Sequence, residues 1–158
     1  MATQNQPKLY VLVGIPGSGK STWVVNQDWA KDCVYVSTDT HVEDYAKSIG
    51  KTYNEVFKDY MPTAVDLMAQ QIIDARDQRR DIIWDQTSTT VISRRRKFNM
   101  LPDYYAIAVV FRCPEVNELM SRLSSRPGKI IPLDVVESMI KNFEIPTEEE
   151  GFKEIWYA

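Results

Sequence analysis

A glycine-rich run at residues 14–22 carries the residue types that bind phosphate. It fits the spacing GxxxxGK[ST] and consists of Gly14, Ile15, Pro16, Gly17, Ser18, Gly19, Lys20, Ser21 and Thr22. Glycines let the backbone curl so that successive N–H groups point inward and form a nest for anions. We expect Lys20 to reach the β- and γ-phosphates of a nucleotide and Ser21 to ligate Mg²⁺. The run, called the phosphate loop below, therefore predicts ATP and Mg²⁺ as cofactors, with every residue except Ile15 in the binding set.

Two carboxylates follow predicted strands at other places in the chain. Asp39 lies just beyond a strand predicted at residues 33–37, and Asp85 ends a strand predicted at residues 81–85. Because ligands of parallel sheets bind at the carboxyl ends of the strands, we expect both to lie near Lys20. Asp39 is then placed to take the proton of an acceptor hydroxyl as general base, with a helix N-cap as the alternative role. Asp85 is expected to contact a Mg²⁺-bound water, the acceptor or an active-site arginine, with a plain strand-end carboxylate as the alternative.

Two arginines stand four residues apart where a predicted helix runs into a Pro/Gly-containing segment. Arg122 and Arg126 can therefore point to one side of the chain. We predict a small lid at about residues 122–131 in which both contact the nucleotide. Arg126 is expected to stabilise the phosphoryl group during transfer. A solvated helix end is the alternative.

A third arginine is expected to point partly inward from a helix predicted at residues 91–101. Arg94 lies on one stripe with Val91, Phe98 and Leu101. A buried guanidinium needs an anionic partner, which Asp85 or an acceptor phosphate would supply. A surface arginine that extends to solvent is the alternative. The neighbouring cations are expected on a solvated face: Arg95, Arg96 and Lys97.

The histidine and four aromatic residues after Asp39 have structural interpretations. His41 is the only histidine, so a histidine metal site is excluded, and a structural role is expected. Stacking on a nucleobase is an alternative to burial in the core for Tyr45, Tyr53, Phe57 and Tyr60.

Apolar strands alternate with amphipathic helices along the whole chain. We predict strands at residues 8–13, 33–37, 81–85, 104–112 and 152–157, and helices at residues 20–29, 41–48, 54–78, 91–101, 114–123 and 134–143. The helix at 54–78 is expected to break before Pro62. Buried stripes are expected at Val65, Met68, Ala69, Ile72 and Ala75, at Val116, Leu119, Met120 and Leu123, and at Val135, Val136, Met139, Ile140 and Phe143. This order predicts an α/β fold, a three-layer P-loop NTPase fold with a parallel sheet flanked by helices and a small lid, in one P-loop kinase domain over residues 1–158.

Composition excludes several other classes of protein. The chain has 158 residues, is 44% hydrophobic and carries a net charge of −3, which argues against broad wrapping of DNA. No apolar stretch is long enough to span a membrane, and the segment Met1–Lys8 is too polar for a signal peptide. Cys33 and Cys113 form neither a CxxC pair nor a metal cluster. We expect a cytoplasmic protein with reduced thiols, and see no sign of a membrane or protein partner.

The classes of phosphate-loop protein can be separated by their other motifs. The Asn-Lys-x-Asp and Asp-x-x-Gly motifs of GTPase switches do not occur in the sequence, and Gln86 follows Asp85 where a motor ATPase usually has a second acidic residue. A kinase needs a carboxylate for the acceptor hydroxyl and arginines for the phosphoryl group, and Asp39 and the lid supply these. The sequence therefore favours a kinase.

Motifs over almost the whole chain resemble the polynucleotide 5′-hydroxyl kinase family, the kinase half of bacteriophage and animal end-healing enzymes. The phosphate loop resembles the family's GxPGxGKST loop, and the segment ending in Asp39 resembles its N-R-D element. The other matching segments are Asp85-Gln86-Thr87 with Arg94, the lid arginines Arg122 and Arg126, Ile130-Ile131-Pro132, and residues 146–152 (PTEEEGF).

This resemblance implies transfer of the γ-phosphate of ATP to the 5′-hydroxyl of a DNA or RNA end, as in nucleic-acid repair. It implies that Asp39 is the general base and that Asp39, Asp85, Thr87 and Arg94 contact the substrate. The chain departs from the family at residues 40–43, which read Thr-His-Val-Glu and lack the arginine often found there. Two alternatives stay open: a kinase of a nucleoside, other small molecule or modified nucleobase hydroxyl, and a nucleotide-binding switch or interaction module without transfer.

Overall fold

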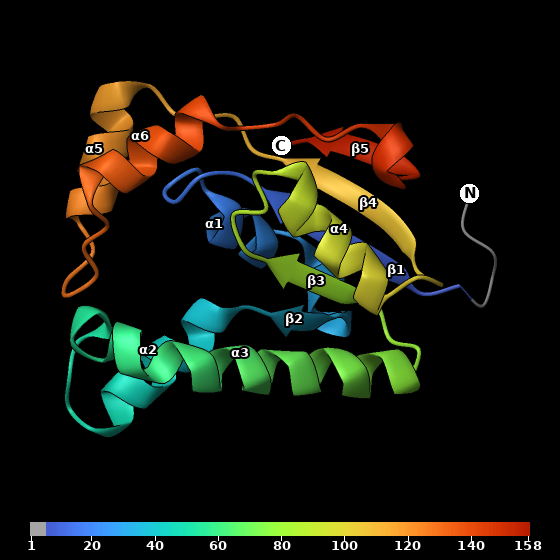
Figure 1. Ribbon diagram of the computed structural model, residues 1–158, viewed down its shortest axis with the longest axis horizontal. Coiled ribbons are helices and arrows are strands. Elements are labelled where there is room, and N and C mark those ends of the chain that lie inside the picture. Colours follow the sequence, from blue (N-terminus) through green and yellow to red (C-terminus); the bar gives the residue numbers. More distant parts are fainter. Residues whose placement is uncertain (1–5) are drawn as a thin grey trace.

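A parallel sheet of five strands forms the centre of the computed structural model, which describes residues 6–158 (Figure 1). The polar segment Met1–Lys8 therefore lies largely outside the described residues. The strand order is β2-β3-β1-β4-β5. The strands are β1 (Lys8–Val13), β2 (Val34–Val36), β3 (Ile82–Asp85), β4 (Tyr105–Val110) and β5 (Glu154–Tyr157).

The central strands are buried on both faces, which explains their continuous apolar runs. In β1, Leu12 lies opposite Asp85 of β3, and Val13 lies opposite Val110 of β4. This register brings the loops that follow β1, β3 and β4 to the same edge of the sheet. The phosphate loop is one of these loops.

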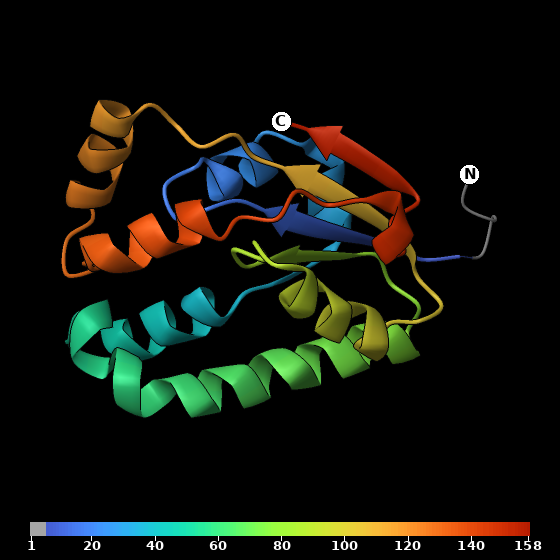
Figure 2. The ribbon, with the colours of Figure 1, turned by 45° about the horizontal axis from the view of Figure 1, so that its top comes forward.

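Helices cover both faces of the sheet, which confirms the predicted three-layer α/β fold (Figure 2). One face packs against α3 (Tyr53–Asp77) and α4 (Val91–Met100), and the other against α1 (Lys20–Val25) and the 3₁₀ helix η1 (Asp28–Asp32). The helix expected at residues 20–29 is thus shorter than predicted. It ends at Val25, and the chain continues through the 3₁₀ turn that carries Trp29 against Tyr10, with 4.5 Å between ring centroids.

The expected break before Pro62 is wrong, because α3 runs through it without interruption. The helix packs against α2 (Thr38–Ser48) with buried side chains on both sides of the proline, including Val56 and Ala64. This packing offsets the backbone hydrogen bond that proline cannot form, a loss of about 3 kcal/mol in a helix interior. Val65, expected in the core, is 45% exposed, and the buried stripe instead contains Ala64, Met68, Ile72 and Ala75.

The pair α5 (Val116–Ser124) and α6 (Leu133–Lys141) lies beside the sheet, over the phosphate loop (Figures 1 and 2). Leu119 of α5 and Val136 of α6 pack on Ile15 of the loop. Because only this narrow stripe is covered, four residues expected inward are exposed: Val116 at 69%, Met120, Val135 and Ile140. Of the helices described, none is long and apolar enough to cross a bilayer. Cys33 and Cys113 are both free thiols.

Candidate active site

The phosphate loop connects β1 to α1 in a conformation that requires glycine. Gly17 and Gly19 have φ angles of 82° and 99°, which side-chain-bearing residues rarely adopt. A Cβ atom on Gly14 would lie 2.9 Å from Phe111 Cβ and 2.6 Å from Ser18 Oγ. The Gly14 N–H donates to the Thr87 carbonyl at 2.9 Å, which ties the loop to the segment after β3.

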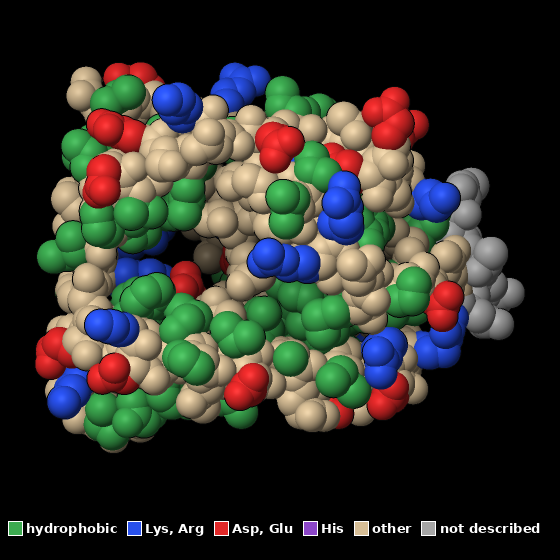
Figure 3. Space-filling model, in the orientation of Figure 1, with side chains coloured by type: hydrophobic (Ala, Val, Ile, Leu, Met, Phe, Trp, Pro, Cys, Tyr) green, Lys and Arg blue, Asp and Glu red, His purple; other side chains and the backbone are tan. Residues whose placement is uncertain are grey.

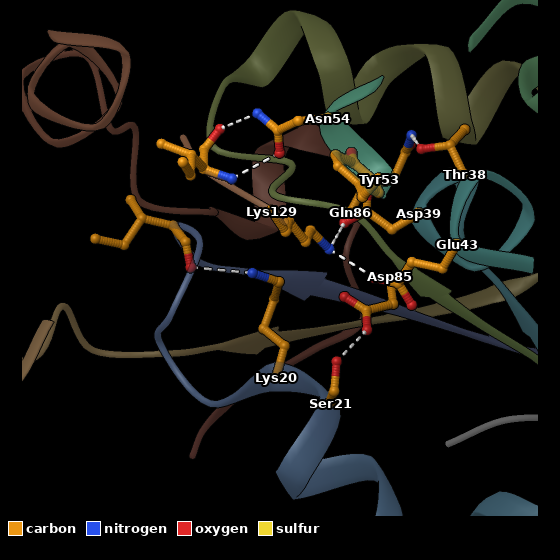
Figure 4. Close-up of polar contacts among 12 residues, drawn as sticks. Lys20, Ser21, Thr38, Asp39, Glu43, Tyr53, Asn54, Asp85, Gln86 and Lys129 are labelled. Carbon is orange, nitrogen blue, oxygen red and sulfur yellow. Dashed lines mark hydrogen bonds and ion pairs between the residues drawn. The ribbon is translucent and has the colours of Figure 1, made fainter. Parts of the chain in front are cut away.

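Lys20 folds back over this loop (Figure 4). Its Nζ donates to the carbonyl oxygens of Gly14 at 2.9 Å and Ile15 at 3.0 Å. Burial lowers the pKa of Lys20 to about 8, and the nearby Asp85 opposes this shift. The ammonium group is thus held at the loop, where an anion could replace its two carbonyl contacts.

Asp85, the last residue of β3, accepts hydrogen bonds from two hydroxyl groups. Ser21 Oγ donates to Asp85 Oδ2 at 3.4 Å, and the Tyr35 hydroxyl donates to the same oxygen. Burial raises the pKa of Asp85, while the Tyr35 hydrogen bond and the charge of Lys20 hold it down. Tyr35 of β2 was missed from the sequence. The only signal for it was its place on the strand before Asp39.

Asp39 lies in the first turn of α2 with both carboxylate oxygens in contact. The Tyr53 hydroxyl donates to Oδ1 at 2.7 Å, and Lys129 Nζ donates to Oδ2 at 3.1 Å. The N-cap of α2 is Ser37 and has no side-chain capping bond, so the alternative role of Asp39 as the N-cap is wrong. Lys129 was not selected from the sequence, and Tyr53 was considered there only for the core or for stacking on a nucleobase, not as a hydrogen-bond donor to Asp39.

The lid (residues 122–131) contacts both the phosphate loop and the residues around Asp39. Arg122 Nη1 donates to the Gly17 carbonyl at 2.9 Å, and its Nη2 pairs with Glu118 at 2.6 Å. Lys129 also contacts Glu43 Oε1 at 2.8 Å, and its Nζ lies 4.5 Å from the centroid of the Tyr53 ring. The cation beside Asp39 therefore comes from the lid, whereas the segment 40–43 that follows Asp39 has no arginine.

One pocket of about 1700 Å³ collects most of the predicted site residues. Figure 3 shows it as a hollow between the α5–α6 pair and the α2–α3 pair, with basic side chains inside. Its lining includes Pro16, Gly17, Ser18, Gly19, Lys20, Ser21, Thr22, Asp39, Asp85, Thr87, Arg122 and Arg126. Residues far apart in sequence thus meet at the carboxyl ends of the parallel strands, where the sequence analysis places them. Two predicted site residues do not line the pocket. They are Gly14, whose N–H anchors the phosphate loop to Thr87, and Arg94.

The partner expected for Arg94 is wrong. Its side chain is 0% exposed, and it donates to both oxygens of Glu150, at 2.7 and 3.1 Å, and to the Ser88 carbonyl at 2.9 Å. Glu150 belongs to the PTEEEGF segment, 56 residues further on. Each guanidinium nitrogen therefore donates a bond inside the protein, and the side chain is buried away from the pocket, so Arg94 does not pair with Asp85 and is not placed to contact an acceptor phosphate.

The expected solvated face on α4 is also partly wrong. Lys97 is 5% exposed, with its Nζ 5.0 Å from the Trp84 ring centroid, whereas Arg95 and Arg96 are exposed as predicted. Burial lowers the pKa of Lys97 to about 8, with Arg94 and Arg96 adding to the shift. Lys97 thus packs against β3 on the same side of the helix as Arg94.

Of the four aromatic residues after Asp39, Tyr53 and Tyr60 are half-buried and pack against the core between α2 and α3, whereas Tyr45 and Phe57 are exposed. Tyr45 and Tyr60 stack on each other with centroids 4.0 Å apart, and Phe57 is exposed and lines the pocket. Tyr53 also lines the pocket. His41 has the structural role expected of it, because its Nε2 bonds Gln71 Oε1 at 2.7 Å.

The site fits a nucleotide with Mg²⁺. Ser18 Oγ, inside the loop, is buried without a hydrogen-bond partner. Its hydroxyl is therefore available to donate a hydrogen bond to a phosphate oxygen. No cluster of three or more His, Cys, Asp or Glu side chains suited to a metal occurs among residues 6–158. Mg²⁺ needs no such cage, because it is usually bound by one or two protein oxygens together with substrate phosphates, and Ser21 and Asp85 offer oxygens beside the loop.

Comparison with known proteins agrees with this fold. The model of the AAA domain family matches residues 9–146. A chain in the structure of the Pnkp1/Rnl/Hen1 RNA repair complex is 26% identical with a TM-score of 0.67, covering 89% of this chain and 45% of that chain. The present chain therefore spans less than half the length of that protein.

Two other solved structures share the fold at lower identity. A putative kinase from Chloroflexus aurantiacus is 15% identical with a TM-score of 0.69, covering 97% of this chain and 88% of its own. A gluconokinase from Sinorhizobium meliloti is 16% identical with a TM-score of 0.53, covering 96% and 81%. The chain belongs to the AAA domain family, and its parallel five-stranded sheet flanked by helices is a P-loop NTPase-like kinase fold.

Proposed function

We propose that this protein transfers the γ-phosphate of ATP to the 5′-hydroxyl of a DNA or RNA end. The observation that carries the proposal is that Asp39 and Lys20 line the same pocket, although 19 positions and one strand separate them. A carboxylate that faces a phosphate-binding loop is what a hydroxyl kinase needs and a simple nucleotide switch does not.

The reaction divides between the two sides of the pocket. Asp39 takes the proton of the acceptor hydroxyl as the new O–P bond forms and the bond between the γ-phosphorus and the bridging oxygen breaks, so that ADP leaves. Lys20 and the loop N–H groups bind the phosphates, and Arg126 neutralises charge on the transferred group. Arg122 holds the loop through Gly17 and borders the nucleotide. Ser21, with Asp85 behind it, would hold Mg²⁺, which neutralises phosphate charge when bound.

Two features support a nucleic acid as the acceptor. The pocket of about 1700 Å³ exceeds the roughly 300–1,000 Å³ of a site for one small molecule, which leaves room for a large acceptor beside ATP. Lys47 and Lys51 line it together with exposed Phe57, which gives cations for phosphates and a ring for a base. The 26% identity to a chain of an RNA repair complex points the same way.

A small hydroxyl compound is the second candidate for the acceptor. The segment 40–43 places Glu43, an anion, one turn after Asp39, and Lys129 is already paired with both carboxylates. This charge arrangement favours an acceptor without phosphates near its hydroxyl, such as a nucleoside or a sugar.

An acceptor screen with γ-labelled ATP tests the proposal. The panel contains 5′-hydroxyl DNA and RNA oligonucleotides, the same oligonucleotides with a 5′-phosphate, nucleosides and gluconate. We expect label on the 5′-hydroxyl oligonucleotides and none on their 5′-phosphorylated counterparts. Label on nucleosides or gluconate alone would overturn the nucleic-acid acceptor and leave the kinase chemistry. No label on any acceptor, despite ATP binding, would favour a switch or interaction module.

A further inference from the structure

The lid is docked on the start of α3 by a compact set of backbone contacts. Asn54 pairs with both backbone groups of Ile130: its Nδ2 donates to the carbonyl at 3.0 Å, and its Oδ1 accepts from the N–H at 2.6 Å (Figure 4). The Asn54 N–H also donates to the Gly128 carbonyl at 2.9 Å. Lid residues 128–130 are thus held at a defined position across the pocket.

This docking brings one lysine to the proposed base. Lys129 Nζ lies 3.1 Å from Asp39 Oδ2 and 2.8 Å from Glu43 Oε1. It also lies over the ring of Tyr53, whose hydroxyl donates to the other oxygen of Asp39 at 2.7 Å. Two groups from different elements therefore fix the rotation of the Asp39 carboxylate.

The exposed fractions of Lys129, Asp39 and Glu43 indicate that these ion pairs matter more for the arrangement of the site than for the free energy of unfolding. The Lys129 side chain is 15% exposed, but Asp39 and Glu43 are 49% and 47% exposed. Ion pairs with half-exposed carboxylates contribute little to stability. A carboxylate offers about four acceptor positions, so Asp39 retains capacity for a hydroxyl proton after these two contacts.

We infer that Lys129 is a positioning residue for Asp39, which holds the carboxylate toward the acceptor when the lid is docked. The inference rests on the proposed function, because Asp39 must be the base. Arg126 stands three positions before Lys129 in the same lid. One docking movement therefore brings a cation to the transferred phosphate and a second cation to the base, so that the base is aligned only when the phosphate is covered.

The test compares three variants in the kinase assay with a 5′-hydroxyl oligonucleotide. Lys129→Met removes the charge and keeps the length of the side chain, Lys129→Arg restores a cation, and Lys58→Met is the control. Lys58 is an exposed lysine of α3 that does not line the pocket. We expect Lys129→Met to lower kcat about 10- to 100-fold with KM for the acceptor within about threefold. Lys129→Arg should recover most of the loss, and Lys58→Met should match the wild type.

A double variant asks whether Lys129 acts through Asp39. If it does, Asp39→Asn and Asp39→Asn/Lys129→Met have the same residual rate, because the base that Lys129 positions is already gone. Additive losses would overturn the inference. So would a higher kcat in Lys129→Met, which would make the lysine an inhibitory latch, or a rise in acceptor KM at unchanged kcat, which would make it a direct contact to the acceptor.

Failure of this inference can be told from failure of the proposed function. If Asp39→Asn retains wild-type transfer, the base assignment itself is wrong. If Asp39→Asn is inactive but Lys129→Met is fully active, only the positioning role fails. Hydrogen exchange of the Ile130 amide, which donates to Asn54, reports in the absence of any acceptor whether the lid of each variant is still docked.

Discussion

Arg94 and Glu150 form a buried bidentate ion pair, with Nε–Oε1 and Nη2–Oε2 distances of 2.7 and 3.1 Å. Glu150 Oε2 also accepts the Thr147 N–H at 2.9 Å, so the pair fixes the turn of the PTEEEGF segment. Phe152, just beyond, packs on Phe98 of α4 with centroids 4.9 Å apart. The pair therefore ties the last strand of the sheet to α4.

Removal of either partner is expected to destabilise the protein strongly. Arg94→Ala leaves the Glu150 charge buried and unpaired, which costs about 3–5 kcal/mol. Arg94→Lys should not restore stability, because the compact ammonium cannot reproduce the planar fork that binds both Glu150 oxygens and the Ser88 carbonyl at once. Urea unfolding measures the loss, and exposed Arg95→Ala is the control, expected within about 0.5 kcal/mol of wild type. Equal stability of Arg94→Ala and Arg95→Ala would contradict the structural role of the pair.

This pair shows what the sequence could not supply. The stripe with Val91 and Phe98 correctly indicated that Arg94 points inward, but the identity of a partner 56 residues away depends on the path of the C-terminal segment. The convergence of Lys20, Asp39 and Asp85 was predictable, because it follows from the position of each residue after a strand of a parallel sheet.

The lid was the least predictable part. Periodicity identified α5 and α6, but could not tell that they cover only the phosphate loop, which leaves Val116 and Met120 exposed. Lys129 carries no motif of its own. Its contact with Asp39 depends on the docking of Gly128 and Ile130 on α3, which is a tertiary event without a local signal.

Lys20 should destabilise the nucleotide-free protein in a pH-dependent manner. Its folded pKa of about 8 lies below the usual 10.5, so between these values the unfolded state binds more protons and wild-type stability rises with pH. Lys20→Met has no ammonium to bury and therefore lacks this pH-dependent loss of stability. We expect it to be about 1–3 kcal/mol more stable than wild type at pH 7, a gain that shrinks from pH 8 to pH 10.5.

Urea unfolding at several pH values measures this difference, and adding ATP with Mg²⁺ gives the second half of the test. ATP should raise the melting temperature of the wild type but not of Lys20→Met, because the variant lacks the cation for the phosphates. A constant stability difference from pH 7 to pH 10.5 would contradict the assigned cause.

Asp39→Asn should separate binding from transfer. The amide keeps the shape of the side chain and can still accept from Tyr53, but it cannot take a proton from the acceptor. We expect kcat to fall about 10²- to 10⁴-fold while the Kd for ATP stays within about threefold. Label transfer and ATP binding by calorimetry are the two measurements, with Asp44→Asn, an exposed residue of α2 outside the pocket, as control. Unchanged transfer would refute the base assignment.

Two glycines allow a test of lid docking by size alone. Gly128 and Gly50 have nearly the same left-handed conformation, with φ angles of 67° and 68°. A Cβ atom on Gly128 would lie 2.5 Å from Thr52 Cβ, whereas a Cβ on Gly50 meets nothing within 4 Å. Alanine therefore adds the same backbone strain at both positions, about 1–2 kcal/mol, but only Gly128→Ala pushes the lid from α3.

Gly128→Ala should lower kcat at least about tenfold, because the lid carries Arg126 and Lys129 to the reacting groups. Gly50→Ala, measured in parallel, should lose stability to a similar degree and keep its activity. Thr52→Gly removes the obstructing side chain and costs only a few tenths of a kcal/mol as an N-cap change, so the double variant Thr52→Gly/Gly128→Ala should regain activity. If Gly128→Ala and Gly50→Ala have the same kcat, the contact of the lid with Thr52 has no part in catalysis.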